Sequence, residues 1–175
     1  MNNYTDKNLL NAVGLSYGEL SLKGKNRGQF EKKLRNKINK VLKGFEYQLF
    51  DDLSKLYVFI NPENLDEITD KLKKVFGIVG LNQSAKVERN DEFIKEKVLE
   101  FANYAYEQGA RTFKIKVNRS NKGFEKKSMD YARELGGHVL VNSPFEKVKM
   151  KDPDVMINVD IRKNVYIYTD RIKTY

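Results

Sequence analysis

Two segments of the chain combine residue types that can bind phosphate. The first runs from Gly18 to Gly28 and has the sequence GELSLKGKNRG, a basic, glycine-rich turn ahead of a helical pattern. Backbone N–H groups and the positive end of a helix dipole attract anions at such a turn. It is not a Walker A loop, because its glycines are spaced one residue too far apart and Asn26 stands where a magnesium-binding Ser or Thr is required. A phosphate contact and an ordinary helix-initiating turn are both open for the candidates Lys23, Lys25, Asn26 and Arg27.

The second segment runs from Lys114 to Phe124, where a strand pattern ends in a loop of cations, amides and one aromatic ring. Single-stranded RNA favours such surfaces, because phosphates need cations and unstacked bases need flat rings. Phe124 is a candidate for stacking, although filling the core beneath the loop is the simpler role for a lone phenylalanine. Arg133 either extends this surface or is only solvated. The candidate cations are Lys114, Lys116, Arg119, Lys122 and Lys126.

No segment carries the groups of a catalytic or metal site. Glu19, Asp154 and Asp160 are acids without a paired acid, histidine or nucleophile, so structural roles are the simpler expectation. The chain has no cysteine, which excludes disulfides, thiolate metal sites and cysteine nucleophiles, and His138 is its single histidine. We therefore expect no catalytic residue, metal or cofactor in this chain.

The positive charge is concentrated in the same two segments. The 175 residues include 33 Lys and Arg against 24 Asp and Glu, a formal net charge of +9. The stretch from Lys23 to Lys43 carries +8 and the stretch from Arg111 to Lys127 carries +6, so the rest of the chain carries −5. Solvated lysine-rich faces are the plain alternative, but segregation on this scale favours a nucleic-acid ligand.

Hydropathy predicts a soluble protein. Hydrophobic residues make up 40% of the chain, enough to bury a core. No apolar run approaches the roughly 18 residues that a membrane-spanning helix needs, and the N-terminus lacks the layout of a signal peptide. We expect a cytoplasmic protein with no membrane partner.

The pattern of residues 1–88 predicts a ferredoxin-like βαββαβ domain. Gly44 should end the first helix, and Asp51 and Asp52 should form the turn of the central hairpin. The predicted elements are a strand at 13–17, a helix at 30–42, strands at 45–50 and 55–60, a helix at 65–75 and a strand within 78–87.

Residues 89–175 predict a second, α/β domain. Asp91 and Ser128 are the expected N-caps of its two helices, and the pair Gly136–Gly137 should end the second helix. Apolar residues and lysines alternate in the strand at 112–117, so one of its faces should be core and the other basic. The remaining predicted elements are helices at 94–105 and 129–135, a strand at 138–141 and a hairpin of strands at 155–161 and 165–169.

Both segments resemble the tRNA 4-thiouridine synthetase family (ThiI), also known as thiamine biosynthesis proteins. The opening motif of this family is matched by Tyr17 to Leu20, Leu22 to Arg27, and Phe30. The RNA-binding THUMP module is resembled by Phe113 to Arg119, with Lys122, Phe124, Pro153 and Asp154. The resemblance covers nearly the whole chain and implies a mixed α/β (α+β) protein, with an N-terminal ferredoxin-like domain at 1–88 and a THUMP domain at 89–175.

The resemblance also implies a function. The two domains would bind tRNA together, with the THUMP domain at the 3′ acceptor end. Family members continue into a PP-loop domain that uses ATP and Mg²⁺ to activate uridine 8 of tRNA for sulfur insertion. The sulfur comes from a persulfide-donating cysteine desulfurase, and the family is also linked to thiamine thiazole biosynthesis.

This chain lacks both the Ser-Gly-Gly-x-Asp-Ser motif of the PP-loop domain and every cysteine. We therefore expect it to be the tRNA-binding fragment of such a sulfurtransferase, cut at a domain boundary, rather than a free-standing RNA-binding piece. The resemblance leaves a homodimer open.

Two alternatives remain open at this point. THUMP modules also occur in methyltransferases, deaminases and pseudouridine synthases, although the motif from Leu22 to Arg27 argues against these enzymes. The other alternative is a protein-interaction or ligand-sensing ferredoxin-like domain with incidental basic faces.

Overall fold

The computed structural model describes residues 4–17, 27–120, 126–169 and 171–173. The chain divides into two compact units. The first unit comprises Leu10–Gln83 and Asp170–Tyr175, and the second comprises Met1–Leu9 and Ser84–Thr169. Within the described ranges, no helix is both long enough and apolar enough to cross a membrane.

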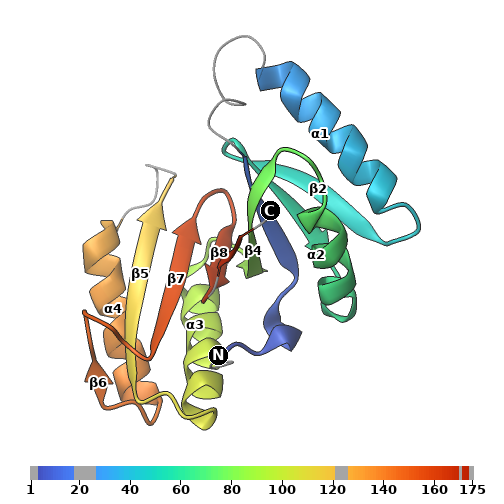
Figure 1. Cartoon of the computed structure of the whole chain (residues 1–175). Coiled ribbons are helices and arrows are strands. Elements are labelled where there is room, and N and C mark those ends of the chain that lie inside the picture. Colours follow the sequence, from blue (N-terminus) through green and yellow to red (C-terminus); the bar gives the residue numbers. More distant parts are fainter. Residues whose placement is uncertain (1–3, 18–26, 121–125, 170, 174–175) are drawn as a thin grey trace. The chain divides into compact units, whose positions relative to one another are not determined.

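The first unit has the predicted βαββαβ order. Its strands follow the order β2-β3-β1-β4, with β3 antiparallel to both β1 and β2 (Figure 1). A short strand that the sequence did not predict, β9 (Arg171–Lys173), pairs with β4. The other elements are β1 (Ala12–Tyr17), α1 (Arg27–Val41), β2 (Tyr47–Asp52), β3 (Lys55–Ile60), a 3-10 turn (Pro62–Asn64), α2 (Leu65–Lys73) and the first part of β4 (Ile78–Val87).

An apolar stripe on α1 forms much of the core of the first unit. Leu34, Ile38 and Leu42 recur at helical spacing and are fully buried, as the sequence predicts. The helix ends at Val41. Gly44 lies in the turn that follows and has a φ of 95°, a left-handed conformation that glycine adopts without strain.

The hairpin between β2 and β3 turns later than predicted. Asp51 and Asp52 are the last residues of β2, and the turn is formed by Leu53 and Ser54, both with positive φ. The Asp51 carboxylate accepts a hydrogen bond from the Ser54 N–H at 2.9 Å. A two-residue turn with positive φ at both positions matches the twist of the flanking strands, which explains the shift.

The second unit combines two helices with a mixed sheet of order β4-β8-β7-β5-β6. Strand β5 is parallel to β6 and β7, and β7 and β8 form the predicted antiparallel hairpin. Helix α3 packs against β7 and β8, and α4 packs against β5 (Figure 1). The elements are a 3-10 turn (Lys7–Leu9), the second part of β4, α3 (Asp91–Glu107), β5 (Thr112–Arg119), α4 (Ser128–Asn142), β6 (Lys147–Val148), β7 (Val155–Ile161) and β8 (Val165–Tyr168).

Helix α4 is longer than predicted. It continues through the Gly136–Gly137 pair, so the predicted strand at 138–141 is helical, and His138 lies within the helix. Tyr131, Leu135 and Val139 recur every four residues, and all are fully buried. This packing outweighs the low helix propensity of two adjacent glycines.

Both N-caps of the second unit lie one residue before the predicted positions. Asn90 precedes α3 and accepts a hydrogen bond from the Phe93 N–H at 3.1 Å. Asp91 is instead in the first turn, where a carboxylate complements the helix dipole. Lys127 precedes α4, and Ser128 is its first residue.

Candidate nucleic-acid interface

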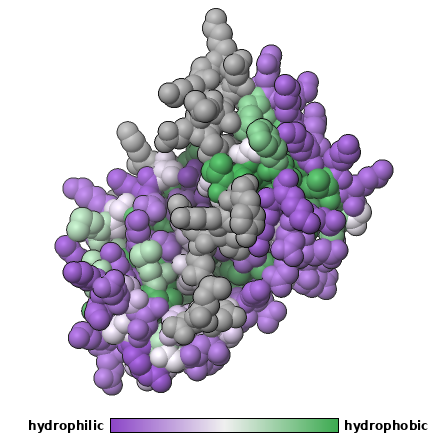
Figure 2. All heavy atoms as spheres, viewed as in Figure 1, coloured by the Kyte–Doolittle hydropathy of each residue, from purple (hydrophilic) through white to green (hydrophobic). Residues whose placement is uncertain are grey.

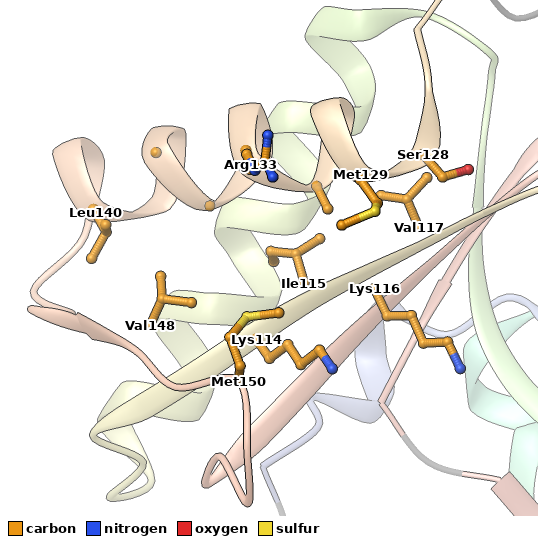
Figure 3. A pocket seen from close by; sticks show the side chains of 13 residues that line it. Lys114, Ile115, Lys116, Val117, Ser128, Met129, Arg133, Leu140, Val148 and Met150 are labelled. Carbon is orange, nitrogen blue, oxygen red and sulfur yellow. The ribbon is translucent and has the colours of Figure 1, made fainter.

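Strand β5 has one apolar and one basic face, which confirms the prediction from its alternating sequence. Phe113, Ile115 and Val117 are buried, whereas Lys114 is half-buried and Lys116 is exposed. The side chains of the two lysines extend to the side of β5 away from α4 (Figure 3). The positive charge of β5 is therefore displayed rather than buried.

A groove of about 700 Å³ lies between β5 and α4. Ile115 and Val117 point from β5 toward α4, and Met129 points back from the helix (Figure 3). Met129 and Met150 are 71% and 67% exposed, so two flexible thioethers stand at its opening. The other lining residues are Lys114, Lys116, Ser128, Ala132, Arg133, Gly136, Gly137, Leu140 and Val148. An apolar groove flanked by cations suits a flat ligand that carries negative charge.

One edge of β5 borders this groove. Strand β6 pairs only with Thr112 and Phe113, and the next contact is the Lys149 N–H donating to the Phe113 carbonyl at 2.9 Å. Peptide groups of alternate residues in a strand point to the same edge, so those of Ile115 and Val117 face the same side as Phe113. Among the described residues, no strand pairs with them there. The groove therefore combines apolar side chains with available backbone donors and acceptors.

Two glycines keep the α4 side of the groove open. A Cβ added at Gly136 would meet Val148 Cγ2 at 4.0 Å, and one at Gly137 would meet nothing within 4 Å. Glycine within a helix costs about 0.5–1 kcal/mol relative to alanine. The prediction that this pair ends the helix is wrong, and it leaves out the groove; paired glycines within an otherwise helical pattern are the sequence signal for such an opening.

The loop that follows β5 is closed at its base. Arg119 donates from Nη1 to the Lys126 carbonyl at 3.1 Å. Lys126 Nζ in turn lies 2.6 Å from Glu134 Oε2 and 3.7 Å from Asp91 Oδ1. Lys95 Nζ lies 3.0 Å from Asp91 Oδ2 and 3.5 Å from Glu134 Oε2. Arg119 and Lys126, both predicted to contact RNA, are thus tied into the structure, and their contact with RNA stays a prediction.

The lysines and carboxylates of this cluster favour each other's charged forms. The hydrogen bond from Lys126 lowers the pKa of Glu134, and the hydrogen bond to Asp91 raises the pKa of Lys95. Burial acts to raise the pKa of Asp91, but bonds from Lys95 and Tyr131 and the nearby positive charges lower it overall. Burial, followed by the bond to Asp91, raises the pKa of Tyr131. The two carboxylates of the network are therefore held in their ionised form.

The acids Asp154 and Asp160 have structural contacts, as expected. The Asp154 carboxylate accepts from the Arg111 and Thr112 N–H groups at 2.8 and 3.1 Å, and these two bonds lower its pKa. Asp154 thereby joins the start of β7 to the start of β5. Asp160 lies 3.1 Å from Arg162 Nε.

Several predicted residues cannot be placed in this site. Lys23, Lys25, Asn26, Lys122 and Phe124 lie outside the described residues, as does Glu19. Arg27 begins α1, but its side chain also lies outside them. Of the candidates in the second unit, Lys114, Lys116 and Arg119 lie on β5, and Lys126 lies at the base of its loop, where its carbonyl accepts the hydrogen bond from Arg119. Arg133 is exposed and lies 3.7 Å from Asp130.

Two family models match this chain. The ThiI ferredoxin-like domain covers residues 13–82, and the THUMP domain covers residues 88–170. A probable tRNA sulfurtransferase of Finegoldia magna is 40% identical over 164 residues, which are 92% of this chain and 42% of the relative. The chain spans less than half the length of the curated relatives it matches.

Two solved structures resemble this chain and agree with the family matches. A 4-thiouridine synthetase in complex with RNA and bound ATP is 34% identical, with a TM-score of 0.76, over 95% of this chain and 42% of that one. A protein of Pyrococcus horikoshii is 30% identical, with a TM-score of 0.79, over 94% of this chain and 55% of that one. Because both domain models match in succession and the relatives agree in sequence and in structure, the chain consists of the ferredoxin-like and THUMP domains of the ThiI family.

Proposed function

We propose that this chain binds tRNA and holds the single-stranded 3′ acceptor end in the groove between β5 and α4. The relatives support tRNA as the ligand, because they are named tRNA sulfurtransferases and one solved neighbour is bound to RNA. The observation that carries the placement is the groove itself, an apolar cavity of about 700 Å³ with an open strand edge and lysines beside it.

Each part of the groove suits a part of an unpaired nucleotide. Ile115, Val117 and the methionines offer apolar area to the face of a base, and the open edge of β5 offers hydrogen bonds to its polar rim. Lys114 and Lys116 are placed to attract the phosphates that precede it. A paired end would leave its bases stacked inside the duplex, so the groove favours single-stranded RNA over a blunt end.

In the whole protein, this binding would position tRNA for a catalytic domain outside the chain. There, ATP and Mg²⁺ would activate uridine 8 for conversion to 4-thiouridine, with sulfur from a persulfide-donating cysteine desulfurase. A role in thiamine thiazole biosynthesis, a cytoplasmic location and a homodimeric assembly belong to the same proposal. The role proposed for the residues of this chain is to bind and orient the tRNA.

Filling the groove tests the proposal. Gly136→Leu places a good helix former where a side chain would extend toward Val148, so α4 should persist while the groove closes. We expect this variant to bind intact tRNA no better than tRNA that lacks its 3′ end. Val141→Leu is the matched control, because Val141 is 82% exposed on α4 and does not line the groove. An undiminished preference of Gly136→Leu for the 3′ end would contradict the placement.

A further inference from the structure

Phe76 of the first unit is an aromatic side chain held in solvent. Its ring is 85% exposed, although the residues on either side of the turn, Val75 and Ile78, are buried. The Val75 N–H donates to the Leu72 carbonyl at 3.1 Å, and the Ile78 N–H donates to the Val75 carbonyl at 3.3 Å. The backbone of this turn is therefore fixed at both ends, and the exposure of Phe76 follows from its geometry.

Gly77 completes the turn. Its φ of 101° is in the left-handed region, and a Cβ at this position would come within 3.0 Å of the Phe30 ring. Only glycine meets both conditions, so the chain reverses here with Phe30 packed beneath the turn. This arrangement keeps Phe76 beside α1.

Phe76 lies beside the basic surface of α1. Lys37 Nζ is 5.3 Å from the centroid of the Phe76 ring. Lys33 and Lys40 lie about one helical turn before and after Lys37, and Lys74 follows α2. All four lysines are exposed, and none forms an ion pair within the part of the chain that the structure describes. Figure 2 shows hydrophilic side chains over this part of the first unit.

We propose that Phe76 is a second RNA contact, on which an unpaired base of tRNA stacks while Lys33, Lys37 and Lys40 contact the adjoining phosphates. The inference rests on the proposed binding of tRNA and adds a site that the groove does not contain. An exposed ring among exposed cations is the combination that single-stranded nucleic acid uses, because every base has a face that stacks and every phosphate carries charge.

The positive charge beside Phe76 favours RNA over an apolar protein as the partner of this surface. The core of a docking surface for protein is depleted in lysine, whereas here Lys37 Nζ lies over the ring. We therefore assign the occupant as nucleic acid.

Substitutions of Phe76 separate stacking from general apolar contact. Loss of one stacked base costs about 1–3 kcal/mol, so Phe76→Ala and Phe76→Leu should both weaken tRNA binding by roughly five- to 150-fold. Phe76→Tyr should bind within about twofold of the unmodified chain, and Val79→Thr is the control for the neighbouring apolar position. The salt dependence should not change in the Phe76 variants, whereas Lys37→Gln should reduce its slope by about 0.7–0.9.

A direct readout is available because the chain has no tryptophan. Phe76→Trp makes the ring the single tryptophan fluorophore, and we expect tRNA to quench it, whereas inorganic polyphosphate, a polyanion without bases, should not. Phe93→Trp on α3 of the second unit is the control and should report little change.

Three results would overturn the inference. They are unchanged tRNA affinity in Phe76→Ala, full affinity in Phe76→Leu, which would indicate a protein-like apolar contact, and no quenching of Phe76→Trp while tRNA binds. An unmodified chain that does not bind tRNA at all would instead overturn the proposed function, and the inference with it.

Discussion

Helix α1 of the first unit and the β5–α4 region of the second unit both come from lysine-rich stretches, but their charges are placed differently. In the second unit, Lys95 and Lys126 share the carboxylates of Asp91 and Glu134. The exposed lysines of α1 have no acidic partner among the described residues. The net charge of a segment therefore does not measure the charge that its side chains can offer to phosphate.

The two regions should therefore contribute differently to RNA binding. Exposed lysines on α1 release counterions when they meet phosphate, which makes their contribution strongly dependent on salt. The groove of the second unit depends on apolar walls and a strand edge, so its contribution should depend on the end of the RNA more than on salt.

The largest expected effect compares two double variants. Lys33→Gln with Lys37→Gln should lower the salt slope of tRNA binding by about 1.4–1.8 and the affinity by on the order of tenfold. Lys95→Gln with Lys126→Gln should change the slope by less than half as much, because those charges are already compensated. Filter binding at several salt concentrations measures the affinity and the salt slope of both double variants. Equal slope changes would contradict the difference between the two regions.

The next effect concerns the rigidity of the second unit. Tyr131 is fully buried and donates from its hydroxyl to Asp91 Oδ1 at 2.8 Å. Tyr131→Phe keeps the ring but leaves the carboxylate with one bond fewer, so the free energy of unfolding should fall by about 1–3 kcal/mol. Thermal unfolding measures the loss. Tyr104→Phe is the control, and a loss of equal size there would remove the special role of the Tyr131 hydroxyl.

A smaller, pH-dependent effect is expected at Asp154. Two backbone hydrogen bonds hold its pKa below the ordinary value of 3.8, so the folded state binds this proton less readily than the unfolded state. Its contribution to stability is present above about pH 4 and is lost as the pH falls through the lower, folded value. Asp154→Asn should cost about 1 kcal/mol at pH 7, since the carboxylate is exposed and screened by water.

The difference in unfolding free energy between the unmodified chain and Asp154→Asn should then shrink as the pH falls below about 4. Denaturant unfolding across this range measures it. A difference that stays constant with pH would show that the bonds to Arg111 and Thr112 do not depend on the charge of Asp154.

The smallest effect tests why α4 contains two glycines. Gly137→Ala meets no neighbouring atom within 4 Å and removes a flexible residue from a helix, so it should stabilise the second unit by about 0.5–1 kcal/mol. Chemical denaturation measures the gain. A loss of stability would mean that α4 does not continue through residue 137 in solution.

Much of the fold follows from local periodicity. The alternation of Phe113, Ile115 and Val117 with lysines is a local signal, and so is the helical spacing of Leu34 and Ile38. Both predictions are confirmed because the buried face needs only the pattern of one element.

Features that depend on distant parts of the chain were missed. The short strands β6 and β9 exist through pairing with β5 and β4, and two or three residues leave no periodicity to detect. Helix α4 passes through Gly136–Gly137 because packing of Val139 beyond them outweighs their low helix propensity. The helix propensity of the two glycines can be read from the sequence, whereas the packing of Val139 depends on the folded structure.

The candidate site was predicted only in part. The basic face of β5 is predicted from residue types, but the groove beside it depends on the space between two elements, for which the glycine pair of α4 is only an indirect signal. Lys126 was counted as an available cation, whereas its bond to Glu134 depends on the fold placing the base of the loop beside α4. The exposure of Phe76 is not predicted from the sequence, because an apolar residue beside a helix end is usually part of the core.

The most direct test is a salt titration of the 175-residue chain with intact tRNA and with tRNA that lacks its 3′ end. We predict that removal of the 3′ end lowers the affinity at every salt concentration while most of the salt slope remains, because the groove loses its ligand and the lysines of α1 keep theirs. Equal affinity for the two RNAs, or binding that does not depend on salt, would contradict the division of roles between the two units.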